Sequence, residues 1–143
     1  MSISINTAQF RYLSMNTRFP FKYGIASMTS LPHVFLCVEM NFDGKIVQGI
    51  ASEGLPPKWF TKNPETTFEE DLPEMISVLS KALDFSKKIR ADTVFEFWVQ
   101  LYELQEHWAR EEKVPPLLAH LGSSLVERAI IDAFCRTSKK NFP

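Results

Sequence analysis

Hydrophobic and polar residues alternate along much of the first third of the chain. In "LPHVFLCVEM" the positions from Val34 to Met40 alternate, which places every second side chain on one face of a strand. "TAQFRYLSMN" shows a rougher alternation, and "IVQGIASE" follows the Asp43-Gly44 turn signal. Three strands joined by such short connections predict an antiparallel meander.

The hydrophobic period changes to that of a helix after residue 66. The first predicted helix has an apolar stripe formed by Leu72, Met75, Ile76, Leu79, Ala82 and Leu83. Thr67-x-x-Glu70 and Asp71-x-x-Glu74 are two competing capping patterns for its start. Pro73 favours the later start, because proline suits the first turn and breaks a longer helix.

Two further helices are predicted in the remaining sequence. The second begins near Asp92 or Thr93 and ends at "KVPP"; its apolar positions are Val94, Phe97, Trp98, Leu101, Leu104 and Trp108. The third follows Ser123 or Ser124, with Ser124-x-x-Glu127 as its cap. Its buried stripe consists of Val126, Ala129, Ile130, Ala133 and Phe134.

This order of elements predicts an α+β fold. The three-stranded antiparallel meander comes first, followed by three helices, or four, that cover one face of the sheet. The 143 residues fit a single domain over 1–143, long enough to bury a core without metals or disulfides.

Composition and charge narrow the class of protein. The 16 basic and 17 acidic residues form no block of like charge, so we expect neither nucleic acid nor a membrane as a partner. "MSISINTAQF" lacks the features of a signal peptide, and the apolar runs are too short to span a bilayer. A soluble, cytoplasmic protein is expected, with Cys37 and Cys135 as free, buried thiols.

The sequence offers no catalytic motif. His33, His107 and His120 have no partner at metal-ligand spacing, and His107 fits a solvated helix face. No phosphate-binding loop, nucleophile elbow or zinc-protease motif occurs. We therefore predict no catalytic residue and no metal ligand in this chain.

Two segments carry more rigid and apolar material than a connector needs. "TRFPFKYGIASMTS", residues 17–30, breaks the strand pattern, and "EGLPPKWFTKNPET", residues 53–66, joins strand to helix. Exposed aromatic residues beside lysines indicate a binding surface. The alternative is that Phe19, Phe21, Trp59 and Phe60 fold back onto the local core, since aromatic side chains bury large areas.

The ordered set of segments resembles a known family. "PFKYG", the passage from "DGK" to "ASEGLPP", and the late "ERAIIDAFCR" are similar to the N-terminal capping domain of the enolase superfamily, in its mandelate racemase/muconate lactonizing enzyme branch. The resemblance covers nearly the whole chain.

The resemblance implies a (β/α)₈ barrel after the cap, which would carry the Mg²⁺ ligands and the acid/base residues. A barrel needs roughly 200 residues or more, so we expect it to be absent from this chain. The isolated chain is then inactive and holds no cofactor. Its parent would be a Mg²⁺-dependent racemase, cycloisomerase or acid-sugar dehydratase.

The resemblance also implies a role for the two unusual segments as lid loops over the barrel mouth. The residues expected to contact a small carboxylate or acid-sugar substrate are Phe19, Phe21, Lys22, Tyr23, Lys58, Trp59 and Phe60, with Lys62 as a further lysine. Without the barrel, exposed apolar surface predicts self-association. The alternative is a stand-alone binding or oligomerisation module with the same fold.

Overall fold

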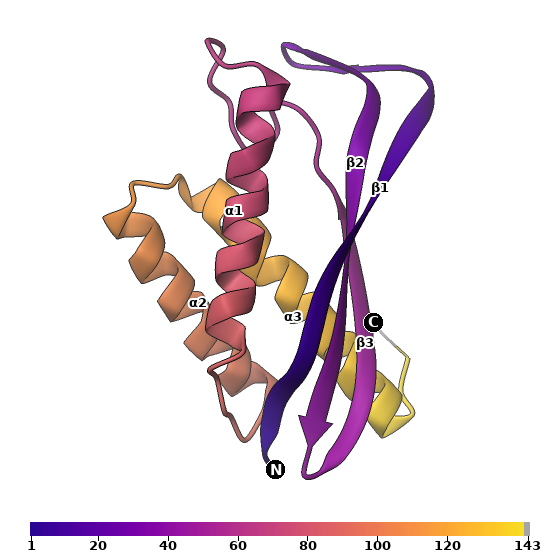
Figure 1. Ribbon diagram of the computed structural model, residues 1–143, viewed down its shortest axis with the longest axis vertical. Coiled ribbons are helices and arrows are strands. Elements are labelled where there is room, and N and C mark those ends of the chain that lie inside the picture. The colour runs from indigo at the N-terminus through magenta and orange to yellow at the C-terminus, as the bar shows by residue number, and fades with distance from the viewer. Residues whose placement is uncertain (142–143) are drawn as a thin grey trace.

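Three antiparallel strands and three helices follow one another in a computed structural model that describes residues 1–141 (Figure 1). The strands are β1 (Ile3–Tyr23), β2 (Ala26–Phe42) and β3 (Lys45–Gly54), paired antiparallel in the order β1-β2-β3. The helices are α1 (Phe68–Ser86), α2 (Val94–Glu111) and α3 (Pro116–Ser138). The predicted α+β meander is confirmed, with three helices in the described part of the chain.

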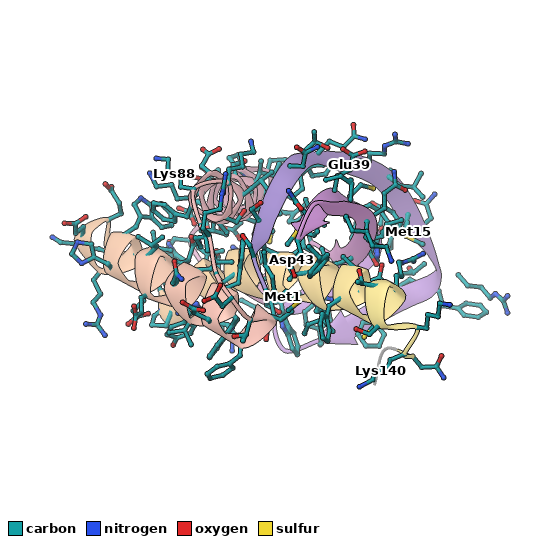
Figure 2. The ribbon with its side chains drawn as sticks, turned by 90° about the horizontal axis from the view of Figure 1, so that it is seen from below. Met1, Met15, Glu39, Asp43, Lys88 and Lys140 are labelled. Carbon is teal, nitrogen blue, oxygen red and sulfur yellow. The ribbon has the colours of Figure 1, made fainter. Side chains whose placement is uncertain are left out.

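The sheet turns one face toward the helices and the other away from them. Val34, Leu36, Val38, Met40 and Phe42 are all buried, as the alternation in the sequence predicts. Figure 2 shows the Glu39 side chain on the opposite side of the sheet from the helices. The core therefore lies between the helix layer and one face of the sheet.

The β2–β3 connection is the predicted two-residue turn. Asp43 and Gly44 both have positive φ, 51° and 89°, which is the backbone conformation of a tight hairpin turn. The Ser2 backbone N–H donates to Asp43 Oδ1 at 2.6 Å, and Met1 and Asp43 lie close together in Figure 2. The turn thus also secures the start of β1.

The segment at residues 17–30 is not the separate loop that the sequence predicts. β1 and β2 continue through it as a hairpin whose last pair is Tyr23 and Ala26, so the expectation of a loop is wrong, although the pairing is interrupted between Asn16 and Phe21. The register shifts between Asn16 and Phe21, around Pro20, which has no backbone N–H to donate. We call residues 17–30 the hairpin tip.

Helix α1 begins at the earlier of its two predicted caps. Thr67 and Glu70 form a complete capping box, so the preference for Asp71 as the cap is wrong. Pro73 lies inside the helix, and the missing N–H costs only a bond to the first turn. Asp71 is instead buried and ion-paired with Lys58.

Helix α2 starts as predicted, with Thr93 accepting a hydrogen bond from the Glu96 backbone N–H. One predicted apolar position is wrong, because Leu104 is 41% exposed. The next residue, Gln105, is buried instead. Its side-chain amide donates hydrogen bonds to the carbonyls of Val78 on α1 and Ala119 on α3. A polar side chain therefore joins the three helices.

Helix α3 begins at Pro116, well before the predicted start at Ser123 or Ser124. Pro116 occupies the first helical turn, where its fixed φ suits the helix. Gly122, which favours the later start by propensity, is required inside the helix. A Cβ at this position would lie 2.3 Å from the Val78 carbonyl oxygen, so only glycine lets α1 and α3 approach this closely.

Helix α3 also covers β3. A Cβ on Gly49 would lie 2.1 Å from the Ala129 carbonyl oxygen, so the helix backbone rests directly on the strand. Asp132 Oδ2 accepts a hydrogen bond from the Ile50 backbone N–H at 2.9 Å. Arg128 Nη1 donates to the Ser52 carbonyl at 2.9 Å. Side chains of α3 thus satisfy backbone groups of β3.

The predicted free thiols are observed at Cys37 and Cys135, although only Cys135 is buried. Cys37 is half-buried because it lies on the face of β2 that points away from the helices.

Candidate functional site

The hairpin tip meets the segment between β3 and α1 at one end of the sheet. We call residues 55–66 the proline loop. The Tyr23 hydroxyl of the tip donates to the Pro57 carbonyl of the loop at 2.6 Å. The Tyr23 ring meets the Trp59 ring edge to face, with centroids 6.1 Å apart. Two segments more than thirty residues apart in sequence therefore form one surface.

The aromatic contacts continue along β1. Phe21 and Tyr23 lie on the same face of the strand, with ring centroids 5.6 Å apart. Burial raises the pKa of the Tyr23 hydroxyl. The row Phe21, Tyr23 and Trp59 thus forms an aromatic wall across both segments.

An open pocket of about 380 Å³ lies beside this wall. Its lining residues are Tyr23, Gly24, Ile25, Lys58, Trp59 and Lys62. Trp59 is 53% exposed and Ile25 is 74% exposed, so much of the apolar lining faces the open side. The volume suits a small organic molecule.

Lys58 anchors the proline loop from within. Its ammonium group lies 2.7 Å from Asp71 Oδ2 and 2.7 Å from the Asn63 carbonyl, and it also contacts Thr66. The Lys58 side chain is only 13% exposed and that of Asp71 only 1%. Thr66 Oγ1 completes the cluster by donating to Asp71 Oδ1 at 2.6 Å.

The structure separates the residues predicted for substrate contact into groups. Tyr23, Lys58, Trp59 and Lys62 line the pocket, but the Lys58 ammonium is engaged by its loop. Phe60 packs against the hydrophobic core, which agrees with the alternative reading for that residue.

The remaining three predicted residues lie on the hairpin tip outside the pocket lining. Phe21 contacts Tyr23, and Phe19 is 74% exposed. Lys22 alternates with Phe21 and Tyr23 along β1, so its side chain leaves the opposite face of the strand. Aromatic character alone therefore did not identify which tip residues meet the proline loop.

Sequence reasoning missed Ile25 and the anchoring role of Asp71. Ile25 gives no signal, because an exposed isoleucine beside a turn is ordinary. Asp71 does give a sequence signal, because it lies four residues before Met75 and therefore on the same buried stripe of α1. A carboxylate on such a stripe needs a charged or hydrogen-bonding partner.

A second polar cluster joins α2 to α3. His120 Nε2 lies 3.0 Å from Glu106 Oε2 and its Nδ1 lies 2.9 Å from Ser123 Oγ, while its ring stacks on Tyr102. Hydrogen bonds from His120 and Arg110 lower the pKa of the Glu106 carboxyl. The set resembles a hydrolytic triad, but Ser123 is 2% exposed, so no substrate reaches its hydroxyl.

The described residues contain neither a cluster of potential metal ligands nor a helix that could span a membrane. Within residues 1–141 no three potential His, Cys, Asp or Glu ligands cluster around a common point. None of the helices in that range combines the length and apolarity needed to cross a bilayer. His107 is 77% exposed and lies 3.3 Å from Glu111, as expected for a solvated helix face.

No family model matches the sequence, and no curated protein matches it. Solved structures do share its fold. An enolase from alpha proteobacterium bal199 with bound magnesium matches 95% of this chain at a TM-score of 0.61 and 18% identity. An enolase from Bradyrhizobium, complexed with magnesium and mandelic acid, matches 98% at 0.60 and 15% identity.

A mandelate racemase/muconate lactonizing protein from Herpetosiphon aurantiacus matches 94% of this chain at a TM-score of 0.60 and 15% identity. This chain covers 32%, 33% and 32% of those three chains, respectively, so it spans about a third of their length. The expected fold is confirmed: residues 1–141 have the fold of one part of enolase and mandelate racemase/muconate lactonizing proteins.

Proposed function

We propose that residues 1–143 form a non-catalytic capping and substrate-specificity domain. Its partner would be a (β/α)₈ barrel of the mandelate racemase/muconate lactonizing enzyme type, which would supply the Mg²⁺ ligands and the acid/base residues. The parent protein would be an isomerase or lyase: a racemase, a cycloisomerase or an acid-sugar dehydratase. Its substrate would be a small carboxylate or an acid sugar.

One observation carries this proposal: the hairpin tip and the proline loop join into a single open pocket beside an aromatic wall. Tyr23 ties the two segments together, and Lys58 fixes the proline loop to α1. A lid that excludes water needs shaped, preorganised segments of this kind. That the chain spans about a third of its structural relatives supports a larger parent.

The reading frame around the gene provides the first test. We expect a downstream segment of roughly 200 residues or more with repeating strand and helix patterns and carboxylates at successive strand ends. The full protein should then show Mg²⁺-dependent turnover of a carboxylate, and residues 1–143 alone should show none. Turnover by the isolated chain would refute a non-catalytic role, whereas a stop codon after Pro143 would favour the stand-alone module.

Variants of the full protein test the specificity role. Trp59→Ala should change the ratio of kcat/KM values between two substrates, because its ring faces the open pocket. Phe95→Ala is the matched control: Phe95 is also an exposed aromatic residue, at 71%, but it lies on α2. Equal effects of both variants on the ratio would contradict the proposal.

We also propose that the isolated chain self-associates. Tyr102, Leu104 and Leu117 are 38%, 41% and 52% exposed on helices α2 and α3, and such surface is often covered by a partner. Light scattering should report a mass above that of the monomer, and a clean monomer at high concentration would contradict this.

The cytoplasmic location stays a prediction, which cell fractionation tests.

A further inference from the structure

The pocket between the hairpin tip and the proline loop offers a ligand apolar surface and one free positive charge. We infer that it takes an apolar group, ring-sized or branched aliphatic, that carries one anionic group, and that it discriminates against polyhydroxylated acids. This inference rests on the proposed function for the place of the ligand in a larger enzyme, and it narrows the substrate class.

Two polar side chains of the lining, Tyr23 and Lys58, donate their protons within the protein. The Tyr23 hydroxyl donates its only proton in a hydrogen bond to the Pro57 carbonyl. The Lys58 ammonium group has three protons, and they are directed to Asp71, Thr66 and Asn63. Neither group has a proton left to donate to a ligand hydroxyl.

The apolar atoms of the lining, in contrast, are free. Trp59 and Ile25 keep 53% and 74% of their surface exposed. Gly24 adds no side chain to the lining, and no atom lies within 4 Å of the place where its Cβ would be. An apolar ligand group would cover Trp59 and Ile25 and remove this surface from water.

Lys62 supplies the remaining charge. It is exposed, it lines the pocket, and among residues 1–141 it takes part in no ion pair. Asp71, the carboxylate that pairs with the lining residue Lys58, is already neutralised by it. An anionic ligand group can therefore approach Lys62 without facing an unpaired carboxylate in the lining, because the six lining residues include no acid.

A polyhydroxylated acid fits these surroundings poorly. Each hydroxyl that enters the pocket exchanges its hydrogen bonds to water for contacts with Trp59, Ile25 and the Tyr23 ring. Sites that select sugars place several unpaired polar groups against the hydroxyls, whereas the side chains of this lining offer only the Lys62 ammonium group and the Trp59 indole N–H. Of the proposed parent reactions, racemisation or cycloisomerisation of apolar acids therefore fits better than dehydration of acid sugars.

The isolated chain allows a direct test by NMR. The sequence has three tryptophans, Trp59, Trp98 and Trp108, so three indole N–H signals are expected, and Trp59→Phe assigns the relevant one. Phenylacetate and gluconate serve as probes, because both carry one carboxylate but differ in the remainder. We expect phenylacetate to shift the Trp59 signal saturably, with an affinity at least about tenfold higher than that of gluconate.

Two lysine variants test the charge. Lys62→Met should weaken phenylacetate binding by about fivefold, the upper range for a solvent-exposed ion pair. Lys22→Met is the control, since Lys22 lies on the opposite face of β1 and should leave the affinity unchanged.

Several results would overturn the inference. These are equal or tighter binding of gluconate, no saturable shift of the Trp59 signal, and equal effects of the two lysine variants. None of these results bears on the capping role, which is tested separately by the downstream reading frame and by the turnover of the full protein. An absent barrel would in turn remove the capping role and leave the ligand preference intact.

Discussion

Strand β2 passes through two different surroundings while it keeps the same partner. From Val34 to Phe42 every second side chain is buried beneath the helices, whereas from Ala26 to Leu31 no side chain is buried. β1 pairs with β2 in both parts. Backbone pairing thus sets the conformation of both halves, and only the helix-covered half uses its side chains to stabilise the fold. The hairpin tip keeps its side chains available for another task.

The largest expected difference is between two leucines of the same sheet. Leu36 is fully buried, and Leu36→Ala should lower the free energy of unfolding by about 2–5 kcal/mol. Leu13 is 54% exposed, and Leu13→Ala should change it by less than about 0.5 kcal/mol. Urea denaturation measures both. Similar losses would show that an exposed side chain of β1 also contributes to stability.

The anchor of the proline loop comes next in size. Asp71→Asn removes the negative charge beside a Lys58 side chain that is only 13% exposed. The loss should be about 3 kcal/mol, the lower end of the range for breaking a buried ion pair. Thermal unfolding measures it, and Glu69→Gln in the same first turn of α1 is the control. If the variant matches the control, the loop does not depend on this pair.

Neighbouring aromatic residues sharpen the comparison within the loop. Phe60→Ala should cost about 2 kcal/mol, roughly half the value for a fully buried phenylalanine, because Phe60 packs partly buried against the core. Trp59→Ala should cost less than about 1 kcal/mol, since its ring is 53% exposed. Chemical denaturation measures the free energy of unfolding of both variants and shows which substitution costs more. A larger loss for Trp59→Ala than for Phe60→Ala would show that Trp59 stabilises the fold and is not free to contact a ligand.

The smallest expected effect concerns pH. Hydrogen bonds from His120 and Arg110 hold the pKa of Glu106 below its ordinary value of 4.5. A lowered folded-state pKa means that the ionised carboxylate stabilises the fold above the unfolded-state pKa, and that this contribution disappears as the pH falls through the lowered value. Glu106→Gln should therefore lower Tm at pH 6, and the difference from the unsubstituted protein should shrink below about pH 4.

Glu103→Gln on the same helix is the control for this pH effect, since Glu103 forms no ion pair among residues 1–141. A Tm difference for Glu106→Gln that stays constant between pH 6 and pH 3 would show that the carboxylate charge is not what matters.

Local signals predicted the parts of the fold that depend on local chemistry. The turn at Asp43-Gly44, the alternation in β2 and the Thr93 cap follow from short-range rules, and each is found as expected. The errors at Pro73 and Gly122 have different causes. At α1 two local signals compete, and the complete Thr67–Glu70 capping box outweighs the preference of Pro73 for a first turn. At α3 a tertiary contact overrides propensity, because the approach of α1 requires a glycine within the helix.

The candidate site was predictable in composition but not in arrangement. The resemblance marked the hairpin tip and the proline loop, and the aromatic and lysine residues named in them lie there. Which side chains meet depends on the strand register past Pro20 and on the left-handed backbone of Lys58, with φ of 56°. Neither is encoded locally, so the sequence did not separate the engaged Lys58 from the free Lys62.

The contacts that α3 makes with β3 make the two outer edges of the sheet unequal in their capacity to pair with a further strand. Asp132 and Arg128 occupy two backbone groups of this edge, the Ile50 N–H and the Ser52 carbonyl, which another strand could not then use. On β1, apart from the bridge between Ile3 and Ala91, the described residues place no strand along the outer edge. The outer edge of β3 is therefore partly occupied by α3, whereas most of the outer edge of β1 is unpaired among the described residues, which makes β1 the more accessible edge for a further strand.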